Sequence, residues 1–189
     1  MISKAEELIF DEVKLIKFRK ECEKRSKKVV FVTGVFDILH VGHLRFLEKA
    51  KKYGDVLIVG INDDVFAKTK GANRPIQNEF DRANLIAGFE CVSCVHIYDI
   101  RKDDTMDILR IVRPDVFIMS TSSTRKPEER LHHSELVRKM GGQVIVFDAC
   151  STIHSTSIIN KSNGYSHNRS SLRNRLIHKK SKIFKIRNL

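Results

Sequence analysis

Short apolar runs alternate with amphipathic stretches over residues 4–147 of the chain. The apolar runs are rich in β-branched and aromatic residues, as expected of strands that are buried on both faces. They cover residues 29–32, 56–61, 92–98, 116–119 and 144–147. The stretches between them carry apolar residues at helical spacing, over residues 4–25, 42–54, 82–89, 105–112 and 128–140. This alternation predicts an α/β fold, a doubly wound parallel sheet with helices on both faces.

Composition divides the chain into three parts. We expect an N-terminal helical extension over residues 1–28, a single domain over residues 29–162 and a basic tail over residues 163–189. Ser, Asn, Arg and Lys dominate past Asn160, so the folded core is predicted to end near that residue. The tail holds eight basic side chains and no acidic one, whereas residues 1–162 hold 27 basic and 23 acidic side chains. Most of the formal charge of +12 therefore belongs to the tail, and an anionic partner such as a nucleic acid is one hypothesis for it.

The sequence also bears on the compartment in which the protein works. It contains no apolar run of the roughly 18 residues that a membrane span needs, and residues 1–7 lack the basic start and apolar core of a signal peptide. The four cysteines are too few and too scattered for a disulfide framework. We therefore expect a soluble, cytoplasmic protein with no membrane partner.

The turn that follows the first predicted strand, residues 33–43, is the first candidate for a ligand site, because such turns face the ligand crevice of a doubly wound sheet. It lacks the GxGxxG pattern of dinucleotide folds and the GxxxxGK[ST] pattern of a P-loop. It offers His40 and His43 at the start of a helix, where both imidazoles and the free N–H groups can serve one phosphate. Taken alone, the pair could instead be two structural histidines, or half of a zinc site whose other two ligands have no obvious source nearby.

The turn is part of a longer signature. The motif G-x-F-D-x-x-H-x-G-H marks the cytidylyltransferase-like nucleotidyltransferases, a Rossmann-type family, and residues 34–43 resemble it as Gly34-Val35-Phe36-Asp37-Ile38-Leu39-His40-Val41-Gly42-His43. The resemblance implies that His40 and His43 are catalytic: they contact the phosphates of a nucleoside triphosphate and stabilise the α-phosphorus during attack. It also implies that Gly34, Val35 and Phe36 help to bind the nucleotide. Such in-line transfer needs positioning and N–H donors but no covalent enzyme intermediate.

The resemblance extends over roughly residues 29–161 and assigns two more cations. Lys70 matches a lysine that contacts the acceptor phosphate in glycerol-3-phosphate cytidylyltransferases, so it is a candidate catalytic and acceptor-binding residue; the alternative is a lysine of a solvated loop. Residues 74–82, with the Phe89-Glu90-Cys91-Val92 that follows, are most similar to the heptose-phosphate adenylyltransferase branch. Arg82 is a candidate triphosphate contact through its guanidinium group; the alternative is an ion pair at a helix start.

Ser155, Thr156 and Ser157 are similar to the closing S-T-T/S-x-I motif of the family, which binds the triphosphate. A Ser or Thr there also makes a good N-cap for the helix expected to follow, and its hydroxyl group together with the exposed N–H groups forms an anion site. Capping alone is the alternative explanation. Both roles are compatible in one residue.

The chain departs from the family pattern in two places. Residues 119–123 replace the G-D-D or K-G-G-D segment after the fourth strand, so the base and acceptor contacts made there do not carry over. Cys150 stands where glycerol-3-phosphate cytidylyltransferases have an arginine, and Arg125, Lys126 or His154 is a candidate to replace its triphosphate contact.

Other residues of reactive type have ordinary explanations. Cys91 and Cys94 form a lone CxxC in which Cys91 matches a buried cysteine of the family, so neither metal binding nor redox chemistry is favoured and no protein-bound metal is predicted. His132 and His133 are adjacent on a predicted helix and are interpreted as surface residues.

The sequence therefore predicts an enzyme that transfers AMP or CMP from a nucleoside triphosphate, ATP or CTP, to a phosphorylated sugar or polyol and releases pyrophosphate. Mg²⁺ is expected to arrive bound to the triphosphate, and a homodimer is expected because relatives commonly form one. Adenylyl transfer onto a coenzyme precursor is the enzymatic alternative. Nucleic-acid binding through residues 163–189 is the alternative from another class.

Overall fold

The structure is a computed structural model that describes residues 3–71, 73–99, 105–121, 126–148, 158–159 and 161. The chain divides into two units, residues 1–152 and residues 153–189. The first unit holds the sheet and the helices α1 to α7. The domain boundaries expected after residues 28 and 162 stay predictions.

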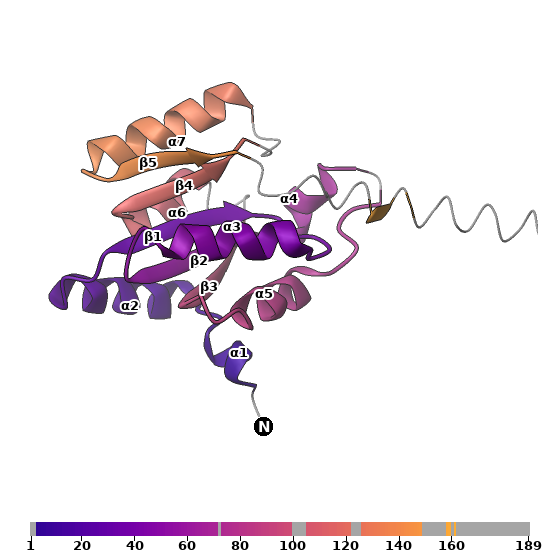
Figure 1. The fold of residues 1–189 in the computed structure, drawn as a ribbon, viewed down its shortest axis with the longest axis horizontal. Helices are drawn as coiled ribbons and strands as arrows, with labels where there is room; N and C mark the ends of the chain where they lie inside the picture. Colours follow the sequence, from indigo (N-terminus) through magenta and orange to yellow (C-terminus); the bar gives the residue numbers. More distant parts are fainter. Residues whose placement is uncertain are drawn as a thin grey trace, which may run out of the picture. The chain divides into compact units, whose positions relative to one another are not determined.

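A five-stranded parallel sheet forms the centre of the first unit (Figure 1). Its strands are β1 (Val29–Gly34), β2 (Val56–Asn62), β3 (Cys94–Tyr98), β4 (Val116–Ser120) and β5 (Gln143–Phe147), in the order β3-β2-β1-β4-β5. The direction of winding reverses between the neighbours β1 and β4, so the loops that follow these two strands border the crevice where such sheets bind ligands. The predicted α/β doubly wound fold is confirmed.

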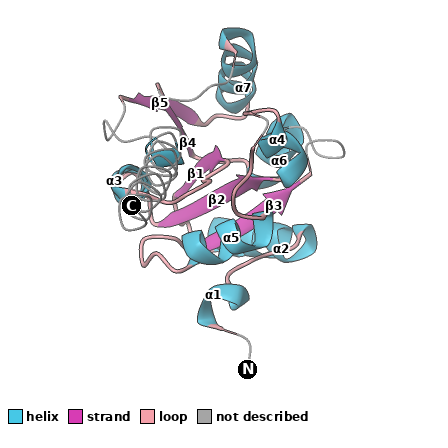
Figure 2. Cartoon of the chain, turned by 90° about the vertical axis from the view of Figure 1, so that its right-hand side faces the viewer, coloured by secondary structure: helices cyan, strands magenta, loops and turns pink. Residues whose placement is uncertain are grey.

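Helices cover both faces of the sheet, and Figure 2 shows α3 and α6 on opposite sides of it. The helices α3 (Val41–Lys51) and α5 (Glu79–Ala87) pack on one face, and α2 (Glu12–Lys24), α6 (Thr105–Val112) and α7 (Pro127–Lys139) pack on the other. Successive strand residues point to opposite faces, so Val30 and Val32 belong to one core while Val29 and Phe31 belong to the other. The apolar runs in the sequence therefore reflect two hydrophobic cores, one on each side of the sheet.

The single leading helix predicted over residues 4–25 is wrong, because the segment forms two helices, α1 (Lys4–Glu7) and α2. Leu8 and Phe10 lie along the β3 edge of the sheet: the Val95 N–H donates to the Leu8 carbonyl at 2.9 Å, and the Phe10 N–H donates to the Val95 carbonyl at 2.8 Å. Asp11 then caps α2 by accepting from the Lys14 N–H at 2.7 Å. Backbone pairing with β3 outweighs local helix propensity here, and periodicity alone cannot reveal it.

Several element ends differ from the predicted ones for local reasons. The helix expected from Arg82 begins at Glu79, because Asn78 caps it by accepting from the Asp81 N–H at 2.9 Å. The strand expected from Val92 begins at Cys94. The short helix α4 (Asp64–Lys68), capped by Asp63, was not predicted, because five residues are too few to show a helical period.

The two adjacent histidines of α7 differ in burial. His132 is exposed, as predicted, but the prediction of a surface position is wrong for His133, whose side chain is only 4% exposed. His133 shares its helix face with the buried Val137, four residues on, and that spacing is the signal by which it could have been recognised.

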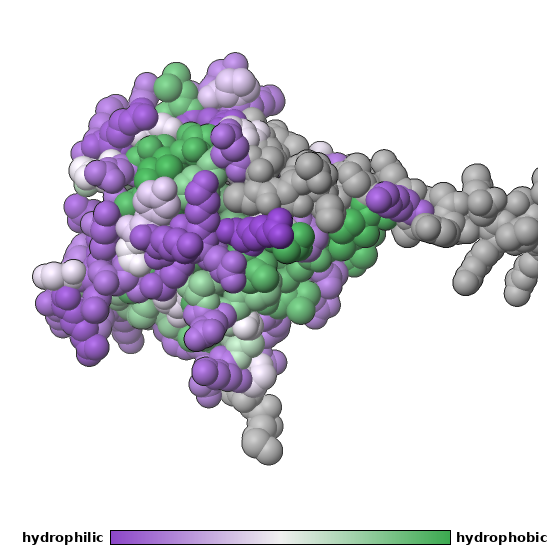
Figure 3. Space-filling view, in the orientation of Figure 1, coloured by the Kyte–Doolittle hydropathy of each residue, from purple (hydrophilic) through white to green (hydrophobic). Residues whose placement is uncertain are grey.

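The face of the first unit that Figure 3 shows carries both polar and apolar areas. In Figure 3, hydrophilic side chains predominate over α3, where Arg45, Glu48, Lys49 and Lys52 are exposed, and apolar surface shows over the edge strand β5, whose Val146 is 48% exposed. Within the described residues, no helix is both long enough and apolar enough to cross a membrane.

Candidate active site

The two histidines of the signature lie at the point where the winding of the sheet reverses. His40 is the N-cap of α3, and its Nδ1 accepts a hydrogen bond from the Gly42 N–H at 3.1 Å. The His40 and His43 rings are stacked with their centroids 3.9 Å apart, and the Phe36 ring meets His43 edge-on at 5.4 Å. The loop after β1 and the first turn of α3 thus form one column of rings.

A glycine, Gly34, lies at the base of this column. A Cβ atom on Gly34 would lie 3.0 Å from the Phe36 ring, tighter than an ordinary carbon contact. The missing side chain lets the Phe36 ring fold back over the end of β1 and support His43. Gly34, Phe36 and both histidines, all predicted from the signature, are therefore brought together.

The cap hydrogen bond also sets the chemistry of His40. Because Nδ1 accepts a hydrogen bond from the Gly42 N–H, the neutral ring carries its proton on Nε2 and presents an N–H donor there. The N-terminus of α3 adds backbone N–H groups and a partial positive charge beside it. Donors of this kind bind phosphate oxygens and stabilise the negative charge that those oxygens gain as phosphoryl transfer proceeds.

Asp37 holds the loop before the histidines in an uncommon conformation. The residues on either side of it, Phe36 and Ile38, have φ values of 54° and 53°, in the left-handed region that a β-branched residue such as Ile rarely adopts. The buried Asp37 carboxylate accepts from Arg74 Nη1 at 2.5 Å, the Ile76 N–H at 3.0 Å and the Gln77 N–H at 3.1 Å. These bonds attach residues 74–77 to the signature loop, residues 34–40, and stabilise the strained backbone of that loop.

The environment of Asp37 favours its ionised form. Burial by itself would raise the pKa of this carboxyl group, but the hydrogen bonds from Arg74, Ile76 and Gln77 and the charge of Arg74 outweigh burial. Together they hold the pKa below its ordinary value of 3.8. Asp37 is therefore an anion at neutral pH and a fixed anchor for residues 74–77.

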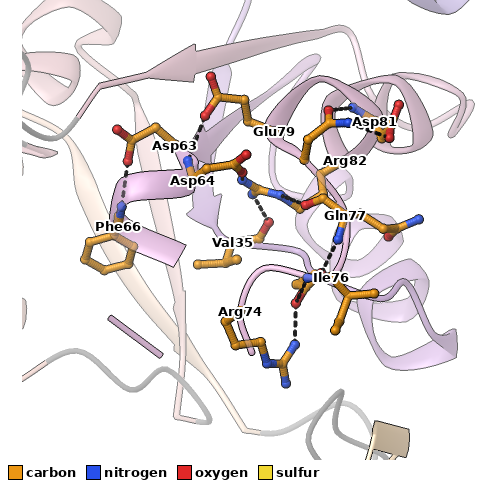
Figure 4. Close-up of polar contacts among 12 residues, drawn as sticks. Val35, Asp63, Asp64, Phe66, Arg74, Ile76, Gln77, Glu79, Asp81 and Arg82 are labelled. Carbon is orange, nitrogen blue, oxygen red and sulfur yellow. Dashed lines mark hydrogen bonds and ion pairs between the residues drawn. The ribbon is translucent and has the colours of Figure 1, made fainter. Parts of the chain in front are cut away.

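Arg82 occupies a different place from the one expected of a triphosphate contact. Its side chain is fully buried and forms an ion pair with Asp64 at 2.7 Å, so the alternative of an ion pair at a helix start describes this structure. Its guanidinium group also donates to the Gln77 carbonyl at 3.0 Å and to the Val35 carbonyl (Figure 4). Arg82 thus reaches the signature loop through Val35, and a direct triphosphate contact stays a prediction.

A buried polar cluster that the sequence analysis did not predict lies at the carboxyl ends of the strands, beside the signature loop. The Tyr98 hydroxyl group is hydrogen-bonded to Thr33 Oγ1 and to Asn62 Nδ2, both at 2.6 Å. The three residues stand at the ends of β3, β1 and β2, and Thr33 directly precedes Gly34. A polar residue at each of three successive strand ends is a signal that could have located this cluster from the sequence.

Of the other residues predicted to be catalytic or to bind the nucleotide, the structure describes Lys70. Lys70 is exposed just after α4, and its ammonium group lies over the Phe66 ring, 4.4 Å from the ring centroid. The structure places it on the surface but does not test its predicted contact with an acceptor phosphate. Ser155, Thr156 and Ser157 lie outside the described residues, as do Arg125, Cys150 and His154. Their predicted roles stay predictions.

The CxxC pair shows no feature of a reactive thiol. Cys94 is buried and Cys91 is half-buried, and burial raises the pKa of both thiols above the ordinary value. Among the residues that the structure describes, no group of three or more His, Cys, Asp or Glu side chains is arranged to hold a metal ion.

The fold is that of a known class of enzyme. Residues 31–161 match the family model described as cytidylyltransferase-like. The chain belongs to the cytidylyltransferase-like family, and the enzyme class expected from the sequence, a nucleotidyltransferase, is confirmed.

Curated relatives narrow the position within the family. The chain is 47% identical over 110 residues to the bifunctional protein HldE of a Nitratiruptor species, an alignment that covers 58% of this chain and 23% of the relative. It is 37% identical over 143 residues to the HldE of Geobacter metallireducens, covering 75% of this chain and 28% of the relative. The chain thus spans about a quarter of the length of these relatives. They confirm the branch of the family predicted from residues 74–92.

Solved structures agree with this fold. A lipopolysaccharide core biosynthesis protein from Thermoplasma volcanium is 30% identical with a TM-score of 0.54, and the match covers 68% of this chain and 99% of that protein. A pantoate-beta-alanine ligase from Francisella tularensis has a TM-score of 0.55 at 19% identity, covering 75% of this chain and 66% of that protein, and shares the fold alone.

Proposed function

We propose that the chain transfers AMP from ATP to a phosphorylated sugar of the heptose 1-phosphate kind and releases pyrophosphate. The observation that carries the proposal is the stacked His40–His43 pair at the N-terminus of α3, where the winding of the sheet reverses. The likeness to HldE proteins and to a lipopolysaccharide core biosynthesis protein supports a sugar phosphate as acceptor. CMP transfer from CTP to a polyol phosphate such as glycerol 3-phosphate is the alternative reaction within the same enzyme class.

In the proposed reaction an oxygen of the acceptor phosphate attacks the α-phosphorus of the nucleotide. The new P–O bond forms as the bond from the α-phosphorus to the α–β bridging oxygen breaks, and pyrophosphate leaves with that bond's electron pair. His40 Nε2–H, the His43 ring and the N–H groups at the start of α3 hold the phosphate oxygens in line and stabilise their growing charge. We propose that Mg²⁺ enters bound to the triphosphate oxygens, the ligands that this cation prefers.

Pyrophosphate release over a panel of substrates tests the proposal. ATP, CTP, GTP and UTP would each be combined with heptose 1-phosphate, glycerol 3-phosphate, phosphopantetheine and nicotinamide mononucleotide, with products identified by mass spectrometry. We expect release with ATP and the heptose phosphate. A coenzyme precursor as best acceptor would establish the alternative named from the sequence, and no release with any combination would overturn the proposal.

Lys70 is the residue proposed to select a phosphorylated acceptor. We expect Lys70→Ala to raise the KM for the acceptor by about tenfold or more and to leave the KM for the nucleotide unchanged, because a charge-assisted hydrogen bond is lost on the acceptor side only. Lys68→Ala, which removes another exposed lysine two residues away, is the matched control and should change neither constant. An unchanged acceptor KM in Lys70→Ala would exclude this role.

Two further expectations about partners stay proposals. A homodimer would be tested by analytical ultracentrifugation of the full chain. An anionic partner for residues 163–189 would be tested by RNA binding, which should weaken steeply with salt and disappear when these residues are deleted.

A further inference from the structure

Arg82 joins three segments that are far apart in the sequence. Its Nη2 pairs with Asp64 of α4 at 2.7 Å, its Nε donates to the Gln77 carbonyl at 3.0 Å, and its Nη1 donates to the Val35 carbonyl in the signature loop (Figure 4). No part of its side chain is exposed. The guanidinium group therefore bonds other parts of the protein in this structure, and its effect on a nucleotide can pass through one of these partners.

The Val35 carbonyl is the partner that leads to the site. The peptide bond between Val35 and Phe36 is trans, and in a trans peptide the C=O and N–H groups point in opposite directions. With the carbonyl turned toward Arg82, the Phe36 N–H points away from Arg82, on the opposite side of the loop. Phe36 is the residue whose ring packs on His43, so this N–H group belongs to a residue of the ring column.

From this geometry we propose that Arg82 is a positioning residue: by binding the Val35 carbonyl it fixes the Val35–Phe36 peptide plane so that the Phe36 N–H serves as a donor to the triphosphate. The role of this N–H rests on the proposed function, whereas the fixing of the peptide plane does not. The left-handed φ of Phe36, 54°, is one that the loop would leave readily if the carbonyl lost its partner.

Asp64 is the acidic partner of Arg82, and it lies at the start of α4. Its own N–H donates to Glu79 Oε2 at 2.7 Å, so the start of α4 is tied to the start of α5, the helix that carries Arg82. A planar guanidinium group can bond Asp64, Gln77 and Val35 at once in fixed directions. A lysine ammonium group in the same place can keep the charge but not this geometry.

Nucleotide binding by two variants and two controls tests the proposal. Arg82→Lys and Asp64→Asn perturb the bonds that Arg82 makes, with little change in side-chain volume. Arg110→Lys alters an exposed arginine that pairs with Asp107, and Ile86→Val trims a buried residue of the same helix, α5, as a control for lost stability. The affinities of the full chain for Mg·ATP and for AMP would be measured by calorimetry, because only the first ligand carries the β- and γ-phosphates.

We expect Arg82→Lys to weaken ATP binding by about tenfold or more while AMP binding changes by less than about twofold, with Asp64→Asn intermediate. Both controls should keep the wild-type ratio of the two affinities. Equal loss for ATP and AMP, or the same change of ratio in Ile86→Val, would show a structural role only and overturn the proposal.

The ligand-free protein gives an independent measurement. The NMR signals of the Val35 carbonyl carbon and the Phe36 amide should shift or broaden in Arg82→Lys and stay unchanged in Arg110→Lys. If wild type binds no nucleotide, the proposed function fails, and these signals still decide whether Arg82 fixes the peptide plane. If wild type binds ATP and both signals are unchanged in Arg82→Lys, the inference about Arg82 fails while the proposed function stands.

Discussion

Two arginine–aspartate ion pairs have nearly equal N···O distances but differ in burial and in the segments that they connect. Arg82 and Asp64 are 2.7 Å apart, and Arg110 and Asp107 are 2.6 Å apart. The first arginine is fully buried and bonds two backbone carbonyls as well, whereas the side chain of the second is 56% exposed on α6, three residues from its partner. Water screens the exposed pair, and it joins residues of one helix. The N···O distance of an ion pair therefore says little about its contribution to stability, which depends on burial and on how many segments the pair connects.

The largest expected effect comes from removing the buried charge. Arg82→Gln should lower the free energy of unfolding by about 3–5 kcal/mol, because Asp64 loses its counter-ion and the half-buried Val35 and Gln77 carbonyls lose their donor. Urea denaturation at pH 7 measures the change. A loss below about 1 kcal/mol would mean that the buried pair resembles the exposed one.

Asp37 forms the second buried pair of the loop, with Arg74, and its contribution should depend on pH. The pKa of this carboxyl is lowered in the folded protein, so its stabilisation is complete above the ordinary value of 3.8 and is lost as the pH falls through the folded-state pKa. We expect Asp37→Asn to cost about 1.5–3 kcal/mol at pH 7, as for hydrogen bonds to a charged group. The difference from wild type should shrink below pH 3.8. A difference that is constant over this range would contradict the role given to the ionised carboxylate.

Gly34 tests the ring column without touching a charge. Gly34→Ala places a Cβ 3.0 Å from the Phe36 ring, so the ring must move against His43. We expect a loss of about 1–2 kcal/mol in stability from overpacking and a larger effect on pyrophosphate release, of at least about tenfold, from displaced histidines. Gly88→Ala, where the added Cβ meets only ordinary contacts, is the control and should leave the rate unchanged.

The exposed pair defines the smallest effect. Arg110→Ala and Asp107→Asn should each change the stability by less than about 0.5 kcal/mol, and a double-mutant cycle should give a similarly small coupling. The same cycle on Arg82 and Asp64 should give at least about 1.5 kcal/mol. Equal coupling energies in the two cycles would remove the contrast between the two regions.

The succession of strands and helices along the chain and the residues of the signature could be predicted from the sequence, because buried strands and a ten-residue motif are local patterns. The sequence could not distinguish an arginine that touches a ligand from one that is buried behind it, because burial of Arg82 depends on Val35 and Asp64, 47 and 18 residues away. The break between α1 and α2 was missed for the same reason, since pairing with β3 decides it. Long-range contacts, not local propensity, explain these differences.

The most direct test of the central claim, that the stacked histidines perform nucleotidyl transfer, is pyrophosphate release by wild type and His43→Ala under saturating Mg·ATP and heptose 1-phosphate. We predict that His43→Ala keeps the wild-type melting temperature within a few degrees and loses at least about a hundredfold in kcat, as when a donor to a developing charge is removed. A folded His43→Ala protein with the wild-type rate would contradict the account.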